Sequence, residues 1–309
     1  MFPAPRARTT AAQAVSSTDT SPQPRPARAA RPLSRLLWLL FCLLSLTSCS
    51  SIQLAYNQMD ILLRWQLSHY VDLNSRQKDR LTSSLESFHR WHRQTQLPRY
   101  ADFLEQLAQA AANGELEEVS LPALESEVNQ LWDSSSGQLY QLLLPLTAQL
   151  TAAQIDTLEK NLQEKNMESL QEWQESPQKV RKERLKRLRK QSRRWLGSIN
   201  DEQQQIITAF IDQVAYSPPL RDQQRRLWQA RFISLLREKP PGYQDQLLDL
   251  MQNPERLWPE EYRQMWEQRR QQAMQLSREL LASTTPAQRE HLTESLRDYA
   301  LDFRSLARR

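Results

Sequence analysis

Four stretches of the chain share one pattern of polar and apolar positions. Each opens with Asn or Thr followed three residues later by Gln, at Asn74, Thr151, Asn200 and Thr285. Leu or Ile then stands seven and eleven residues after that Asn or Thr, at Leu81 and Leu85, Leu158 and Leu162, Ile207 and Ile211, and Leu292 and Leu296. The polar pair is typical of a capping box, in which the first side chain accepts a bond from a helix amide and Gln reaches back to the cap. Because residues four apart share one helix face, the pattern predicts four amphipathic helices with buried stripes.

The spacing of the four motifs indicates an internal duplication. The first and third motifs are 126 residues apart, and the second and fourth are 134 apart. Trp132 and Trp266 each stand nineteen residues before the second motif of their half. We therefore predict quasi-repeats at 73–197 and 199–309. Capping boxes are frequent, so four unrelated helices with a common start are the alternative.

Composition also favours helices. Only four of the 309 residues are Gly, far below the roughly 7% of average proteins, and β-branched residues, which strands prefer, are few. Pro145 falls inside the apolar run 139–150 and should kink that helix or start it. Other proline positions divide the chain further, at Pro98, Pro122, Pro177, Pro218, Pro219, Pro240, Pro241, Pro254 and Pro259. The sequence thus predicts an all-α, multi-helix bundle of about eight to eleven helices.

The beginning of the chain has the parts of an export signal. Residues 36–46 are apolar but too few to span a bilayer; Arg35 precedes them, and Thr47, Ser48 and Cys49 follow. This arrangement resembles the lipobox of bacterial lipoproteins. The resemblance implies a leader and signal peptide at 1–48, cleavage between Ser48 and Cys49, and a lipid on Cys49. An ordinary signal peptide or a short buried helix with a chance cysteine is the alternative.

The residues after Cys49 place the expected helical domain, 49–309, near a membrane. No Ser, Gly or Pro linker follows the cysteine, and apolar positions on one helix face begin at once, with Ile52, Tyr56, Met59, Leu63 and Tyr70. We expect the domain within about 10–20 Å of the membrane. Ser50, rather than Asp, after the cysteine favours the outer membrane, facing the periplasm.

The charge of the chain is concentrated in the expected leader. The first 48 residues hold six Arg and one Asp, so the 41 basic and 36 acidic residues of the whole chain fall to 35 of each in residues 49–309. The mature net charge is then zero, and the basic balance of the full chain gives no reason to expect nucleic acid as a partner. Cys42 also lies in the leader, so we expect no disulfide and no cysteine redox chemistry.

One segment of the domain is nevertheless strongly basic. Residues 179–194 contain ten Lys or Arg residues and a single acid, Glu183. Seven of these positions are candidate contacts with an anionic surface: Lys179, Arg181, Lys182, Arg184, Arg187, Lys190 and Arg194. Anionic phospholipid is the expected partner, at about 1 kcal/mol per Lys or Arg near the surface, followed by lipopolysaccharide phosphates or an acidic envelope protein. A solvated face balanced by acids elsewhere in the fold is the alternative.

A second group of special residues surrounds a histidine. Trp91, His92, Arg93 and Tyr100 could line a polar cleft in which Arg93 holds a carboxylate or phosphate. The alternative is that Trp91 is a core residue and the arginine pairs with acids on neighbouring helices. His89 follows a Glu at the spacing used by di-iron bundles, but the second such motif is missing, so we predict no metal and no cofactor.

The same cluster carries a family resemblance. The Trp-His-Arg string at 91–93, the Leu-Pro-x-Tyr string at 97–100 and the Leu-Thr-x-x-Gln-like caps resemble a family of uncharacterised proteobacterial lipoproteins. The resemblance covers most of the chain from Cys49 onwards, although Asn200 and Thr285 depart from the usual Leu-Thr-Pro cap. It implies the location and the fold, and no activity.

Known catalytic motifs are missing from the sequence. It contains no Gly-rich phosphate loop, no Gly-x-Ser-x-Gly elbow and no Cys/His cluster. We therefore expect a non-catalytic binding or scaffold protein of the cell envelope. The alternative is an envelope enzyme, such as a glycan-cleaving hydrolase or lyase, which needs little more than one Glu in a cleft.

Overall fold

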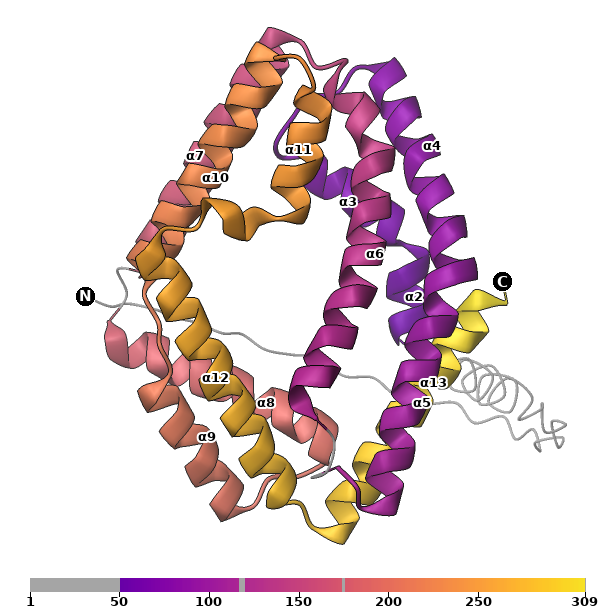
Figure 1. Ribbon diagram of the computed structural model, residues 1–309, viewed down its shortest axis with the longest axis vertical. Coiled ribbons are helices and arrows are strands. Elements are labelled where there is room, and N and C mark those ends of the chain that lie inside the picture. The colour runs from indigo at the N-terminus through magenta and orange to yellow at the C-terminus, as the bar shows by residue number, and fades with distance from the viewer. Residues whose placement is uncertain (1–50, 117–119, 174–175, 309) are drawn as a thin grey trace, which may run out of the picture. The chain divides into compact units, whose positions relative to one another are not determined.

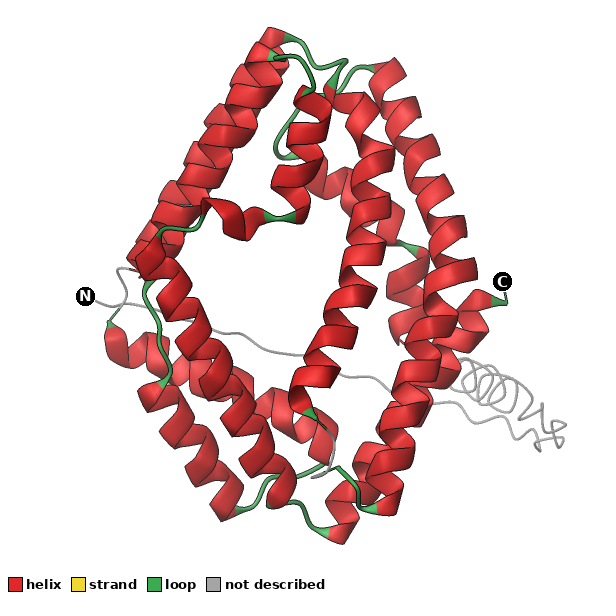
Figure 2. Ribbon diagram, in the orientation of Figure 1, coloured by secondary structure: helices red, strands yellow, loops and turns green. Residues whose placement is uncertain are grey.

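The computed structural model describes residues 51–116, 120–173 and 176–308, and these residues form helices and loops but no strand (Figure 2). The predicted all-α class is therefore confirmed. Ser48 and Cys49 lie outside the described residues. The first helices, α2 (Ser51–Asn57) and α3 (Met59–Ser68), are separated only by Gln58. Counted as one, they bring the α-helices of the described part of the chain to eleven, within the predicted number.

The remaining elements follow in chain order (Figure 1). They are α4 (Ser75–Trp91), the π-helix η2 (His92–Gln96), α5 (Leu97–Asn113), α6 (Leu121–Thr147), α7 (Ala152–Trp173), α8 (Pro177–Leu196), α9 (Asp201–Gln213), α10 (Pro218–Glu238), α11 (Tyr243–Gln252), the 3₁₀ helix η3 (Pro254–Leu257), α12 (Glu260–Ala282) and α13 (Pro286–Ala307). Pro145 lies in the last turn of α6, so no helix begins there.

All four predicted capping boxes are formed. They open α4, α7, α9 and α13, which begin one residue after the predicted cap. At α7, for example, the backbone N–H of Gln154 donates to the Thr151 hydroxyl at 3.2 Å, and that of Thr151 donates to the Gln154 side chain at 3.0 Å. The stripes behind these caps are also confirmed, because seven of the eight apolar side chains are buried and Leu162 packs against a buried cluster.

The four caps are joined in two pairs that the spacing did not predict. The side-chain amides of Gln77 and Gln154 exchange two hydrogen bonds, of 3.0 and 2.7 Å. Those of Gln203 and Gln288 do the same, at 2.9 Å each. Each side-chain amide nitrogen also donates a second hydrogen bond to a backbone carbonyl. The accepting residues stand two positions before the N-cap of the partner helix, at Gln149, Asp72, Ser283 and Ser198. The starts of α4 and α7, and those of α9 and α13, are thus held together by one repeated unit.

The helices of the described residues also pack in matching combinations (Figure 1). Helix α4 packs on α6 and α9 packs on α12, while α7 packs on α10 and α13 packs on α5. The approach of α5 to α13 is the closest because small residues line it. Ala101, Ala108, Ala111 and Ala300 are all fully buried there. This arrangement is the one expected if the proposed quasi-repeats exchange their second α-helices, α5 and α10.

The first two helices present two apolar faces. Ile52, Tyr56 and Met59 pack against the end of α13, as the predicted stripe requires, but Leu63 is 37% exposed. On the other face, Leu54, Ile61, Leu62 and Trp65 are exposed. None of the helices in the described ranges is long and apolar enough to cross a bilayer.

Candidate functional site

A buried histidine joins four helical segments. His92 is 9% exposed, and its Nδ1 atom lies 3.1 Å from the hydroxyl of Tyr56 on α2. Its Nε2 atom lies 3.3 Å from the hydroxyl of Tyr100 on α5, which in turn lies 2.5 Å from Oγ of Ser135 on α6. A neutral imidazole has one donor and one acceptor nitrogen, so the chain of four groups can be satisfied in a single direction.

The local backbone explains how His92 reaches this position. His92 begins η2, the π-helix between α4 and α5, and Pro98 follows in the first turn of α5. A proline inside a helix lacks an N–H and clashes with the carbonyl four residues earlier. The extra residue of a π-bulge relieves that conflict, and such bulges are common at functional sites.

Burial controls the titration of this cluster. It lowers the pKa of His92 to about 4, with a smaller contribution from the nearby His89. Burial raises the pKa of Tyr56 to about 12, although Arg93 acts in the opposite direction. The imidazole is therefore neutral and the phenol protonated at neutral pH. This state is the one that the hydrogen-bond chain requires.

We expect the stability of the protein to fall in mild acid because of His92. Its pKa is lower in the folded chain than the 6.5 of a free histidine, so the unfolded chain binds more protons between pH 6.5 and 4. Neutral His92 therefore contributes fully to the free energy of unfolding above pH 6.5. This contribution, up to about 3 kcal/mol, is lost as the pH falls. Urea unfolding across this pH range should show a shallower pH dependence for His92→Gln than for the native chain.

A matched control is available in His69, an exposed histidine at the end of α3. The substitution His69→Gln removes an exposed imidazole and should change the free energy of unfolding by less than about 0.5 kcal/mol. If His92→Gln and the native chain lose stability equally between pH 6.5 and 4, the buried imidazole is not the group responsible.

The other candidates of this cluster are engaged in packing. Arg93 donates to the side chain of Asn57 at 2.5 Å and lies over the ring of Tyr56 at 5.4 Å. Trp91 is half-buried, with its ring 5.9 Å from that of Phe88. The structure thus brings His92, Arg93 and Tyr100 together around Tyr56. Sequence reasoning missed Tyr56 and Ser135, which come from other helices.

The basic segment forms α8, and several of its candidate residues have partners within the fold. Arg181 pairs with Asp212 of α9 through two bonds of 2.5 and 2.9 Å. Arg184 lies 4.3 Å from the ring centre of Tyr216. Arg194 donates to the hydroxyl of Tyr299 on α13.

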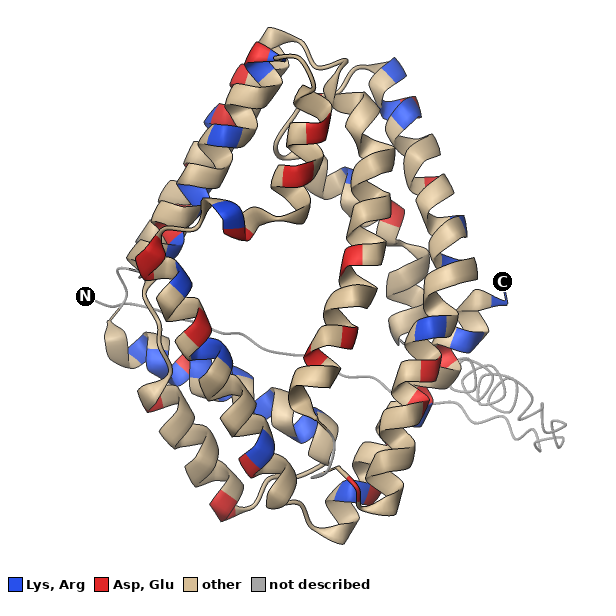
Figure 3. Ribbon diagram, viewed as in Figure 1, with Lys and Arg blue, Asp and Glu red and all other residues tan. Residues whose placement is uncertain are grey.

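One side of α8 is free of such partners. Lys182, Lys186, Lys190 and Arg193 are exposed and contact no acid among the described residues. We call these four residues the basic face of α8, and Figure 3 shows how densely Lys and Arg occupy this helix. Spacings of four, four and three place them on one side. Arg187 is exposed beside them, as is Lys179 at the start of the helix.

Two of the four basic-face residues belong to the predicted set of seven candidates. Lys182 and Lys190 were among the candidates, whereas Lys186 and Arg193 were not. Helical spacing was the signal that would have found them. Arg181, Arg184 and Arg194 are instead engaged within the fold, by Asp212 on α9, Tyr216 in the loop after α9 and Tyr299 on α13.

A groove between α6 and α12 is a further site that the sequence did not indicate. It has a volume of about 340 Å³, and its walls include Leu121 and Glu125 of α6 and Trp266 and Met274 of α12. Trp266 is 44% exposed there. The groove is mainly apolar and accessible to solvent, as small-molecule sites commonly are.

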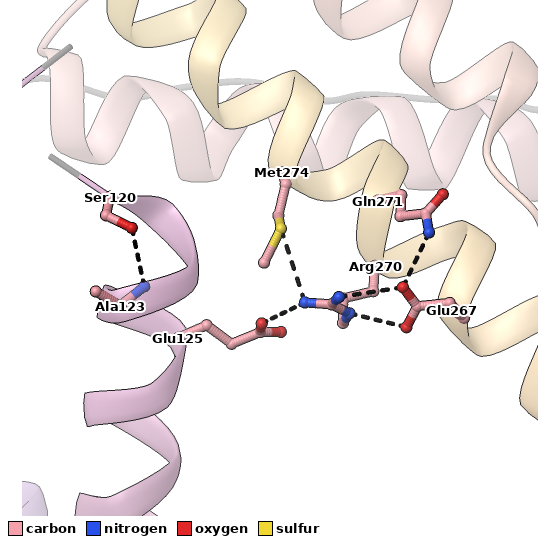
Figure 4. Close-up of polar contacts among 7 residues, drawn as sticks. All are labelled: Ser120, Ala123, Glu125, Glu267, Arg270, Gln271 and Met274. Atoms are coloured by element: carbon pink, nitrogen blue, oxygen red, sulfur yellow. Dashed lines mark hydrogen bonds and ion pairs between the residues drawn. The ribbon is translucent and has the colours of Figure 1, made fainter. Parts of the chain in front are cut away.

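Arg270 bridges the two walls of this groove (Figure 4). It donates to Glu125 at 2.5 Å and to the two carboxylate oxygens of Glu267 at 2.9 and 3.1 Å. The hydrogen bonds that Arg270 donates to Glu267 and Glu125 raise its pKa above the ordinary value. Ser120 caps α6 beside this bridge by accepting from the N–H of Ala123. Arg270 therefore links α6 to α12 through ion pairs and is not a free cation.

The buried carboxylate of the described residues is held by two arginines. The buried carboxylate of this part of the chain is Asp222, which accepts from Arg225 and Arg226 at 2.6 Å each. Burial acts to raise its pKa, but the two arginines outweigh burial and the net pKa is lowered. A general acid needs the opposite shift. No three His, Cys, Asp or Glu side chains of the described residues are placed to hold a metal ion.

Fold and sites together define a class of protein: an all-α chain with a buried Tyr-His-Tyr chain, a basic face and an apolar groove. Comparison with family models identifies the group within that class. Residues 69–263 match the Family of unknown function (DUF6279), and the chain belongs to this family. Comparison with curated proteins and with solved structures gives no match.

Proposed function

We propose that this family member is a lipid-anchored, non-catalytic binding protein of the bacterial cell envelope, in the outer membrane and facing the periplasm. Its anchor is a lipid on Cys49, and its partner is an anionic phospholipid surface. The basic face of α8 carries the proposal. Four exposed cations on one side of a helix, without acid partners among the described residues, stand out in a domain of zero net charge.

The magnitude of the expected attraction is large enough to measure. Each Lys or Arg near an anionic bilayer contributes about 1 kcal/mol, so the four residues contribute roughly 4 kcal/mol at low salt. The attraction decays within a Debye length of about 8 Å at physiological ionic strength. A lipid anchor supplies the remaining affinity and keeps the face close to the membrane.

The apolar side of α2 and α3 supports the same orientation. Leu54, Ile61, Leu62 and Trp65 are exposed in helices that begin two residues after Cys49. Apolar side chains including Trp are typical of helices that lie in the interface of a bilayer. Both α2 and α8 pack on α13, which links the apolar side to the basic face within the described domain.

We expect the unlipidated chain to bind vesicles that contain phosphatidylglycerol and to bind pure phosphatidylcholine vesicles much less. Changing Lys182, Lys186, Lys190 and Arg193 to Gln should weaken this binding about a hundredfold or more at low salt, because roughly 1 kcal/mol is lost per residue. Cosedimentation with the two vesicle types at two salt concentrations measures the effect.

The control removes the same charge from another part of the chain. Arg76, Lys78, Arg80 and Arg221 are exposed, and Gln at these four positions gives an equal change in net charge. That variant should lose at most a few-fold in affinity. Equal binding by the basic-face variant and the native chain, or equal losses in both variants, would refute a specific role for α8.

A further inference from the structure

The groove between α6 and α12 is lined by one guanidinium group without an acid partner among the described residues. Arg269 of α12 lines the groove and makes no hydrogen bond or ion pair within the described residues. Arg184 of α8 is half-buried against Tyr216, and no carboxylate contacts it there. The two cations also interact: burial lowers the pKa of Arg184, and Arg269 lowers it further by repulsion.

The neighbouring Arg270, unlike Arg269, has acid partners. The guanidinium of Arg270 is held by Glu125 and Glu267, so its charge is neutralised (Figure 4). Arg269 comes next to it in the chain but has no such acid. Because like charges raise the free energy of the folded chain, an anion that pairs with Arg269 in the groove would be favoured.

The remainder of the groove suits an apolar group. Leu121 of α6 faces Trp266 and Met274 of α12 across a volume of about 340 Å³. Trp266 offers an exposed aromatic face, and the flexible Met274 adapts to the shape of what it contacts. An apolar group and an anion therefore meet complementary surfaces at adjacent positions.

We propose that this groove binds a single-chain anionic amphiphile, with its carboxylate or phosphate at Arg269 and its chain along Leu121, Trp266 and Met274. Neither half of the ligand is sufficient. A free anion is screened by solvent, and an apolar chain alone leaves Arg269 unpaired. The inference is independent of the proposed function, because the groove and the basic face of α8 share no residue.

The test uses decyl phosphate below its critical micelle concentration as the probe, with titration calorimetry on the folded chain. The native chain should bind decyl phosphate more tightly than decyl maltoside or inorganic phosphate. Decanoate in a parallel titration decides whether a carboxylate serves as well as a phosphate, and tighter binding of either anion than of the maltoside supports the site. Equal affinity for decyl phosphate and decyl maltoside would overturn it.

Two groove variants and two matched controls locate the site. Arg269→Gln and Trp266→Ala should each weaken binding of decyl phosphate about tenfold. Arg278→Gln removes an exposed arginine of α12 that does not line the groove, and Trp65→Ala removes an exposed tryptophan of α3. Both controls should bind as the native chain does, and a loss shared by the groove and control variants would refute the site.

A final variant separates this site from the membrane surface. The chain with Gln at the four basic-face positions should keep its affinity for decyl phosphate, even if it no longer binds vesicles. Loss of decyl phosphate binding in that variant would assign the anion to the basic face instead. Circular dichroism spectra and melting curves confirm that each variant is folded before the titrations are compared.

Discussion

Replacing Gln203 by alanine is expected to lower the free energy of unfolding by about 3 kcal/mol. The side chain of Gln203 is 0% exposed and uses all of its hydrogen-bonding capacity. Its oxygen accepts from the Asn200 amide and from Gln288, and its nitrogen donates to Ser283 and Gln288. Truncation leaves these buried partners unpaired and opens a cavity, and each unpaired group costs on the order of 1–3 kcal/mol.

Urea unfolding followed by circular dichroism measures this change. Gln205→Ala provides the control, because Gln205 lies two residues further along α9 and is exposed. The same substitution there should change the free energy of unfolding by less than about 0.5 kcal/mol. Similar values for both variants would show that the buried amide pair contributes nothing beyond helix propensity.

A double-mutant cycle with Gln288→Ala tests the pairing itself. Because Gln203 and Gln288 share two hydrogen bonds, the effects of the single variants should not add. We expect a coupling free energy of about 1–2 kcal/mol, within the range measured for groups in contact. Additive effects would contradict a direct link between the starts of α9 and α13.

The helix starts could be predicted because a capping box is local. Asn200 and Gln203, for example, are three residues apart, and their mutual bonds need no other part of the chain. The joining of caps could not be read from spacing, since Gln203 and Gln288 are 85 residues apart. One signal was nevertheless present: all four boxes use Gln. Glu serves a capping box equally well but cannot donate, so the repeated choice of Gln indicates a second, acceptor partner.

The candidate sites were predictable only in part, for a similar reason. The sequence predicts that α8 is basic, but Asp212 on α9, Tyr216 in the loop after α9 and Tyr299 on α13 decide which of its arginines are engaged. His92 and Tyr100 can be predicted to lie close together, because they belong to one continuous helical stretch. Tyr56 and Ser135 come from separate helices.

The groove shows most clearly what the sequence alone does not predict. Its two walls come from α6 and α12, and its bridge joins residues 145 positions apart, Glu125 and Arg270. Helical periodicity assigns each residue to a face of its own helix, but it does not say which helix lies opposite. Trp266 was noticed in the sequence only as a marker of the quasi-repeat.

The largest effect of all is expected from Cys49→Ala. The sulfur of Cys49 is the only thiol at the end of the signal-like segment, so alanine there removes the proposed attachment point of the lipid. Each buried methylene contributes about 0.8 kcal/mol, and two or more acyl chains together make the anchoring stable. The native protein should remain with the membrane in high salt and incorporate labelled palmitate, whereas Cys49→Ala should incorporate none and keep its leader.

Cys42→Ala is the matched control, since Cys42 is the other cysteine of the chain and lies inside the apolar segment. It should be labelled and anchored as the native protein is. Retention of palmitate by Cys49→Ala would refute the lipid anchor. Residual membrane association of Cys49→Ala that disappears in high salt would instead report the basic face of α8, because screening weakens electrostatic attraction and leaves acyl chains in place.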